Sequence, residues 1–233
     1  MVCDLSCFLW AVSIVILLVA YSRKQLDSLG FLSGIVMGFA LFFAGGFNWL
    51  IPMIIFFVLG SLFTSFKKDL KKELGVNGKA RTWKNVWANG GAAFIFAVLA
   101  ILFPSHSNTL YLALIACLSV ALADTSATEL GQIFGKKPVS PITLQPAKIG
   151  EPGAVSKEGL LASFVGSTII GLWGYITGVT LEIVAIIVVI GFLGAFLDSI
   201  LGATFEKRGI FNTHLINFLT TFLGGVIALV IFI

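Results

Sequence analysis

Long apolar runs alternate with short polar breaks along the whole chain. Eight runs are long enough to be membrane-spanning helices, because about 20 apolar residues cross the hydrocarbon core of a bilayer. They cover residues 5–21, 29–45, 48–65, 84–103, 109–131, 158–177, 180–204 and 214–233. Only Gly45, Gly46 and Asn48 separate the second run from the third, so a merged or re-entrant pair is the main alternative to this count.

The composition supports a membrane protein. Of the 233 residues, 58% are apolar and only 11% are charged, which excludes a soluble enzyme or a nucleic-acid-binding protein. The apolar runs are continuous, as in residues 183–190, and lack the alternation that a transmembrane barrel requires. We therefore predict an all-α polytopic transmembrane helical bundle that forms a single domain over residues 1–233.

The basic residues are confined to alternate connections between the predicted helices. Cytoplasmic loops carry an excess of Lys and Arg, so the pattern places these connections in the cytoplasm and both termini outside it. The basic residues are Arg23, Lys24, Lys67, Lys68, Lys71, Lys72, Lys79, Arg81, Lys84, Lys136, Lys137, Lys148, Lys157, Lys207 and Arg208.

Polar residues enter the predicted spans from the same side. Ionisable groups at membrane depth are costly unless they face a partner or a polar cavity, so their convergence at one level indicates a site that opens to the cytoplasm. The residues concerned are Asn85, Asn89, Asp124, Glu129, Asp198, His214 and Asn217.

Three acids suit a hard divalent cation. Asp124 and Glu129 lie among the hydroxyls of Thr125 and Thr128, and the pair Asp198 and Ser199 comes from another helix. Mg²⁺ is usually held by one or two carboxylates together with substrate phosphates. We therefore expect Asp124, Glu129 and Asp198 to be catalytic residues that bind Mg²⁺. A proton or sodium relay and a structural ion pair are the alternatives.

A second motif suits phosphate. Arg81, Lys84, Asn85 and Asn89 lie at helical offsets of zero, three, four and eight, which turns them toward one side of a helix start. Two cations, two amides and a helix N-terminus there favour a polyphosphate. Binding of lipid head groups at the membrane edge is the alternative.

Three further sequence features are less specific for a function. The glycine-rich loop before the sixth span offers Gly153 and Ser156 to an anion, although such loops are common. His214 and Asn217 share a helix face, and a His at a helix start is more typical of capping or of a head-group contact than of general-base catalysis. A stripe of Gly30, Gly34 and Gly38 indicates close helix packing, with a homodimer contact left open.

Five segments resemble the phytyl-phosphate kinase and transmembrane protein 19 family of small polytopic membrane proteins. The segments are RTWKNVWANGG at 81–91, ADTSATELG at 123–131, GEPGAVS at 150–156, DSILGAT at 198–204 and HLINFL at 214–219. Ser126, where a Trp is frequent, and Pro152 in the glycine-rich loop depart from the family pattern.

The resemblance implies transfer of the γ-phosphate of a nucleoside triphosphate to a prenyl monophosphate, which gives the diphosphate. CTP is the expected donor, Mg²⁺ the expected cofactor, and a phytyl- or geranylgeranyl-phosphate-like lipid the expected acceptor. The residues alone leave two alternatives open. One is a polyprenol kinase or a cytidylyltransferase that makes a CDP-lipid, and the other is a transporter of small ions or anions.

Overall fold

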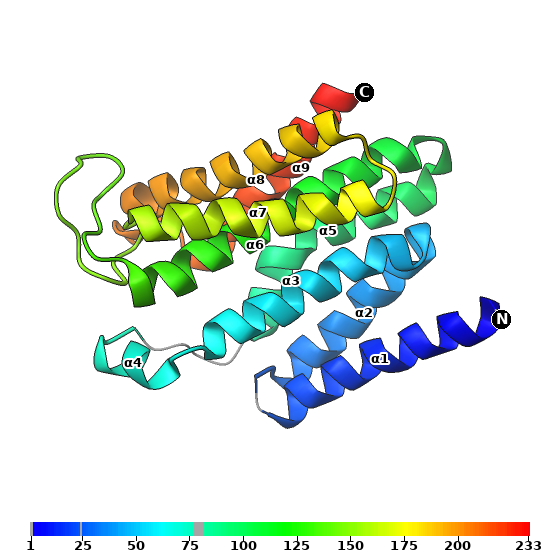
Figure 1. Ribbon diagram of the computed structural model, residues 1–233, viewed down its shortest axis with the longest axis horizontal. Helices are drawn as coiled ribbons and strands as arrows, with labels where there is room; N and C mark the ends of the chain where they lie inside the picture. Colours follow the sequence, from blue (N-terminus) through cyan, green and yellow to red (C-terminus); the bar gives the residue numbers. More distant parts are fainter. Residues whose placement is uncertain (1, 24, 77–81) are drawn as a thin grey trace.

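Helices make up most of the chain in the computed structural model, which describes residues 2–23, 25–76 and 82–233, with side chains from residue 12 onward (Figure 1). The α-helices are α1 (Val2–Ser22), α2 (Ser28–Gly45), α3 (Phe47–Ser65), α4 (Lys68–Glu73), α5 (Trp83–Leu102), α6 (Ser107–Phe134), α7 (Lys157–Ile176), α8 (Leu181–Leu201) and α9 (Thr213–Phe232). A 3₁₀ turn, η1 (Pro104–His106), precedes α6, and a π-helix, η2 (Gly202–Glu206), extends α8. The described residues contain isolated β-bridges but no strand.

The predicted polytopic helical bundle is confirmed. Within the described residues, seven helices are long and apolar enough to cross a membrane, and they coincide with the second to eighth predicted spans. The first predicted span coincides with α1, which is apolar over its described part, Val12–Ser22. The break between the second and third spans is also present, because Gly46 adopts a φ of +67° between α2 and α3.

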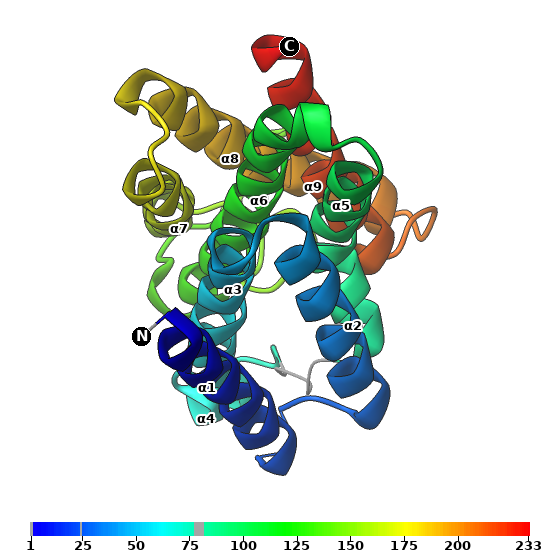
Figure 2. The same cartoon turned by 90° about the vertical axis from the view of Figure 1, so that its right-hand side faces the viewer.

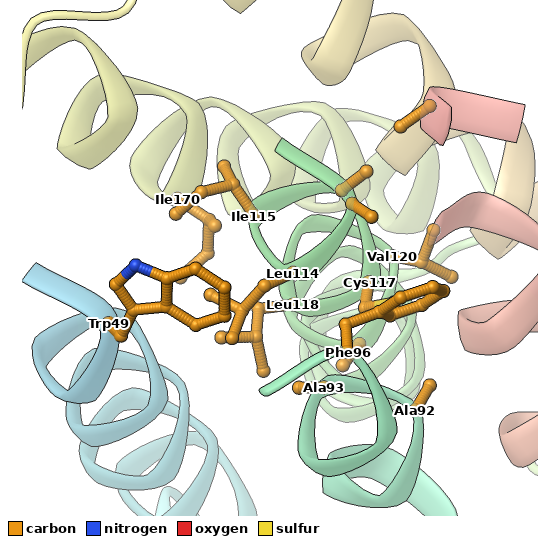
Figure 3. Packing of buried hydrophobic residues seen from close by; sticks show 14 of the residues in the cluster. Trp49, Ala92, Ala93, Phe96, Leu114, Ile115, Cys117, Leu118, Val120 and Ile170 are labelled. Atoms are coloured by element: carbon orange, nitrogen blue, oxygen red, sulfur yellow. The ribbon is translucent and has the colours of Figure 1, made fainter. Parts of the chain in front are cut away.

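Helix α6 forms the centre of the bundle, with α3, α5, α7, α8 and α9 packed around it (Figure 2). Every residue from Ala113 to Ala123 has a relative exposure of 0%. Side chains from neighbouring helices, including Trp49, Phe96 and Ile170, fill the surrounding core (Figure 3). A helix that is apolar on all sides is stable only when it is enclosed in this way.

Small residues allow the neighbours to approach α6 closely. A Cβ atom on Gly191 of α8 would lie 2.2 Å from the Ser119 Oγ atom, and one on Gly166 of α7 would lie 2.8 Å from the Leu122 carbonyl oxygen. In membranes, where lipid tails are as apolar as the helices, such contact surfaces associate through van der Waals packing of small residues. The glycines of α7 and α8 are therefore part of what fixes α6 in place.

The two ends of the bundle differ in chemistry. All described Lys and Arg residues lie in or beside the connections at one end, which we call the basic end and which includes α4 and the α6–α7 loop (Figure 1). Helix α1 begins and α9 ends at the opposite end (Figure 1). There, the Trp173 Nε1 group donates to the Asn48 carbonyl oxygen at 3.0 Å, and the Tyr111 and Thr177 hydroxyls are 2.8 Å apart. Such aromatic residues are typical of a membrane interface.

Candidate functional site

A polar cavity of about 630 Å³ opens among the helix ends at the basic end. Its walls come from α3, α5, α6, α7, α8, η2 and α9, from the loop over residues 149–156, and from Gly75, Val76, Thr82 and Pro138 in other connections. Because α6 has 28 residues, it is about 42 Å long and exceeds the hydrocarbon thickness of a bilayer, so its C-terminal turns can reach the polar head-group region. The cavity is therefore formed where the predicted membrane-spanning helices end.

Nearly all the residues predicted from the sequence line this cavity. They are Asn85, Asn89, Asp124, Thr125, Thr128, Glu129, Gly153, Ser156, Asp198, Ser199, His214 and Asn217. Residues from five separate segments are thus brought together.

Two predicted phosphate-binding residues are not seen at the cavity. Arg81 lies outside the described residues. Lys84 does not line the cavity; its side chain is exposed and its Nζ atom lies 5.8 Å from the centre of the Trp83 ring. A step of one residue along a helix turns the side chain by about 100°, so Lys84 faces away when its neighbour Asn85 faces inward.

A row of amides crosses from α5 to α9. The Asn85 Oδ1 atom accepts from the Thr82 backbone N–H and hydroxyl, both at 3.0 Å, which closes the first turn of α5. One turn on, the Asn89 Nδ2 group donates to the Asn85 carbonyl oxygen at 3.0 Å, and the Asn217 Nδ2 group lies 3.5 Å from the Asn89 Oδ1 atom. The row sets its amide groups at fixed positions along one wall.

Two buried oxygen atoms in the cavity wall have no hydrogen-bond partner among the described residues. They are the Oδ1 atom of Asn217 and the Oγ atom of Ser163. Buried polar atoms almost always have a partner in folded proteins, and an exception calls for a bound water, ion or ligand. This pair is consistent with a ligand site.

Three carboxylates face the cavity from two helices and the π-helix. The Asp198 Oδ2 atom accepts from the Thr220 hydroxyl at 3.0 Å, and the Glu206 carboxylate accepts from Thr213 at 2.5 Å. Asp124 of α6 lines the same cavity as Asp198 and Glu206. The three carboxyl groups are therefore gathered around one volume.

None of these three acids has a basic partner within the described part of the chain. The acids of the cavity that do form ion pairs are Glu129, with Lys71, and Glu151, with Lys207. No three Asp, Glu, His or Cys side chains among the described residues are grouped so as to hold a metal ion by themselves. The expected set of Asp124, Glu129 and Asp198 is thus not assembled as a three-carboxylate cage.

Glu129 is engaged by a buried lysine. The Lys71 side chain, with a relative exposure of 0%, lies 2.5 Å from the Glu129 Oε2 atom and also donates to the carbonyl oxygens of Phe63 and Thr64 at 2.8 and 3.3 Å. The Glu129 Oε1 atom accepts from the Thr64 hydroxyl at 2.7 Å. Three donors of the ammonium and both oxygens of the carboxylate are therefore used. We call this arrangement of Lys71, Thr64 and Glu129 the clamp. It joins α4 and the end of α3 to α6.

The glycine-rich loop packs backbone to backbone on the end of α8. Gly153 has a φ of +74°, and a Cβ atom on it would lie 2.2 Å from the Ser199 carbonyl oxygen. The Ser156 hydroxyl caps α7, because it accepts from the Gly159 backbone N–H at 3.0 Å. Both residues therefore shape the cavity through the fold of the loop.

An exposed ion pair ties the same loop to the α8–α9 connection. The Lys207 ammonium donates to Glu151 at 2.5 Å, and the Lys148 backbone N–H donates to its other oxygen at 3.0 Å. The hydrogen bond from Lys207 is the main reason that the pKa of Glu151 is lowered. The pair therefore stabilises the loop above the ordinary Glu pKa and is lost as the pH falls through the lowered value.

His214 lines the cavity but does not cap α9. That role belongs to Asn212, whose Oδ1 atom accepts from the Leu215 backbone N–H at 2.9 Å. The capping interpretation of His214 is thus wrong, and its imidazole faces the cavity from the first turn of α9.

Sequence reasoning missed several residues that shape the site. Glu206 follows Asp198 and Gly202 at four-residue spacing, which could have placed it on the same helix face. Asp27 accepts from the backbone N–H groups of both Gly30 and Trp83, at 2.6 and 3.0 Å, and so joins the starts of α2 and α5. No sequence pattern signals the second contact.

Removal of Lys71 should strongly destabilise the protein. In Lys71→Met the Glu129 carboxylate loses its counter-ion, and breaking one side of a buried pair costs about 3–5 kcal/mol. Thermal unfolding in detergent should show this loss, whereas Lys72→Met, at an exposed side chain, should change the stability by less than about 0.5 kcal/mol. The double variant Lys71→Met/Glu129→Gln should lose less than the sum of the single variants. Equal stability of the Lys71 and Lys72 variants would contradict the clamp.

Comparison with known proteins identifies the family. Residues 11–225 match the family model described as "Integral membrane protein DUF92". An uncharacterized membrane protein of Methanocaldococcus jannaschii is 34% identical over 218 residues, which cover 94% of this chain and 90% of that protein. Two Arabidopsis thaliana proteins also match. Protein PGR is 30% identical over 82% of this chain and 75% of its own length, and Protein VTE6, chloroplastic, is 25% identical over 88% and 64%.

No solved structure matches the chain. The family match covers most of the sequence, including all the residues that line the cavity. The chain therefore belongs to the DUF92 family of integral membrane proteins.

Proposed function

We propose that this protein is a membrane kinase that transfers the γ-phosphoryl group of a nucleoside triphosphate to a prenyl monophosphate. The observation that carries the proposal is the group of three carboxylates, Asp124, Asp198 and Glu206, which face one cavity without a basic partner among the described residues. Charges at membrane depth are costly unless they are compensated. A cation that arrives with the substrates would compensate them.

Mg²⁺ fits this donor set. Carboxylate, hydroxyl and amide oxygens are the ligands of a hard cation, and Mg²⁺ commonly takes one or two carboxylates and completes its shell with water and substrate phosphates. Asp124 and Asp198 would hold it, and Glu206 lines the same cavity. When bound, Mg²⁺ would bridge the phosphates and offset the charge that develops during transfer. Glu129 is paired with Lys71, so it would position α6 and would not bind the metal.

The amide row would orient the phosphates. Asn89 and Asn217 hold their side chains side by side in the wall, and hydrogen bonds to a phosphoryl group would add to those they already make. Arg81 is expected to supply a cation from the start of this segment. Lys84 does not line the cavity, and we propose that it binds lipid head groups instead of the substrate phosphates.

The chemistry needs no strong base. A phosphate oxygen of the acceptor, already ionised, forms a bond to the γ-phosphorus, while the bond from that phosphorus to the bridging oxygen of the nucleoside diphosphate breaks. The products are the prenyl diphosphate and the nucleoside diphosphate. His214 therefore need not act as a general base, although it faces the cavity.

The resemblance of the five motifs to the phytyl-phosphate kinase and transmembrane protein 19 family supports a prenyl monophosphate as acceptor and CTP as the first donor to test. The lysines and arginines of the basic end support a cytoplasmic location of the cavity, where nucleotides are available.

A transporter is disfavoured by the centre of the bundle. The fully buried segment 113–123 of α6 has Ser119 as its one polar residue, and the described polar residues of the cavity lie on the basic side of this segment. A transporter usually places its site near the midplane between two halves that move.

A labelling assay tests the function. Purified protein in detergent is incubated with Mg²⁺, geranylgeranyl monophosphate and CTP or ATP labelled at the α or γ position, and the lipid products are separated. We expect γ-label in a prenyl diphosphate. Label that enters lipid only from the α position would instead establish a cytidylyltransferase, and no label from either position would contradict a nucleotide-dependent lipid enzyme.

Loss of either central acid should abolish the transfer. Asp124→Asn and Asp198→Asn keep the side-chain size but remove one charge each, so kcat should fall by about 100-fold or more, the range for removal of one group that stabilises developing charge. Asp69→Asn, at a side chain that is 95% exposed on α4, should keep full activity. Size-exclusion chromatography should show all three variants folded. Full activity in both cavity variants would contradict the assignment.

A further inference from the structure

A second, apolar cavity lies beside the polar one. It has a volume of about 270 Å³ and is enclosed by α1, α2, α3 and the start of α5. Apart from Ser13 and Asn85, its described lining residues are apolar side chains or glycines. In Figure 2, α1 lies at the edge of the bundle beside α2 and α3, away from the central α6. We call this cavity the α1–α3 groove.

A glycine stripe keeps the groove open. Gly30, Gly34 and Gly38 line it at intervals of four residues, and they extend over about 12 Å of α2. A Cβ atom on Gly34 would lie 3.3 Å from Leu17 of α1, and one on Gly38 would lie 3.7 Å from Leu50 of α3. A Cβ atom at Gly38 would thus make only an ordinary van der Waals contact, so the backbone at this position lies beside the open volume of the groove. The stripe faces elements of its own chain, which accounts for it without a homodimer contact.

The two cavities share Asn85. This residue lines both the groove and the polar cavity, and its backbone and side chain take part in the hydrogen bonds of the α5 start. The neighbouring residue Val86 lines only the groove. The apolar groove therefore adjoins the polar cavity at the first turn of α5.

The groove is also accessible from the lipid side. Ile14 and Phe39 line it, yet 50% and 47% of their surfaces are exposed, so the lining continues to the outer surface of the bundle. In a bilayer this surface contacts acyl chains. An amphiphile could therefore enter sideways with its polar end toward Asn85.

From this juxtaposition we infer that the α1–α3 groove binds the prenyl tail of the lipid phosphate whose head occupies the polar cavity. The inference rests on the proposed function and assigns a role to α1 and α2, which contribute almost nothing to the polar cavity. A nucleotide does not fit a groove with two polar lining residues.

A steric test uses Gly38→Leu. The added side chain would fill the groove without touching the polar cavity, so the ratio of kcat/KM for geranylgeranyl to that for dimethylallyl monophosphate should fall at least tenfold. Val36→Leu also places a leucine on α2, but at a lipid-facing position, 44% exposed and outside the groove, and should leave the ratio unchanged. An unchanged ratio in active Gly38→Leu would overturn the tail assignment while the kinase activity stands.

A second readout does not need catalysis. A geranylgeranyl monophosphate with a diazirine at the tail end is photolysed with the protein in nanodiscs, and labelled residues are mapped by mass spectrometry. We expect label on α1, α2 and α3 that unlabelled geranylgeranyl monophosphate competes away and that Gly38→Leu reduces. Label on α8 or α9, or label that is not competed, would overturn the inference. If the wild type transfers no phosphate but shows competed groove labelling, the kinase proposal fails and the tail site stands.

Discussion

Burial of α6 on every side is the constraint that determines where polar chemistry can occur in this protein. From Ala113 to Ala123 the helix is enclosed completely, and glycines of α7, α8 and α9 allow their backbones to approach it. The next residue, Asp124, already lines the polar cavity. One helix thus supplies both the centre of the apolar core and the first acid of the site, so the position of the acid is fixed by the packing of the core.

The acids around the cavity have two different environments. Glu129 and Glu151 are paired with lysines and join the surrounding segments, α4 in one case and the α8–α9 connection in the other. Asp124, Asp198 and Glu206 have no such partner among the described residues. The acids that join neighbouring segments therefore differ in their partners from the acids that we propose to hold the cation, even though all five line the same cavity.

Most of the fold could be predicted from the sequence because each span carries its own signal, a run of apolar residues bounded by charge. It could also be predicted that polar residues from separate helices meet in one cavity, because each of them lies at the end of a span that faces the same side of the membrane. These residues are Asn85, Asp124, Asp198 and Asn217. The pairing of Lys71 with Glu129 could not, since it joins residues 58 positions apart and depends on how α4 folds back. The α1–α3 groove could not be predicted either, because the glycine stripe alone does not indicate which helices pack against it.

Three carboxyl groups of the cavity have no basic partner among the described residues, and the central claim is that a divalent cation bound with phosphate is held by them. Mn²⁺ prefers the same oxygen ligands as Mg²⁺ and can be followed by electron paramagnetic resonance. A titration with Mn²⁺ in the presence of CTP and geranylgeranyl monophosphate should show one bound ion, with affinity at least tenfold weaker in Asp198→Asn than in Asp69→Asn. Equal affinity in the two variants, or no bound ion in the wild type, would contradict the account.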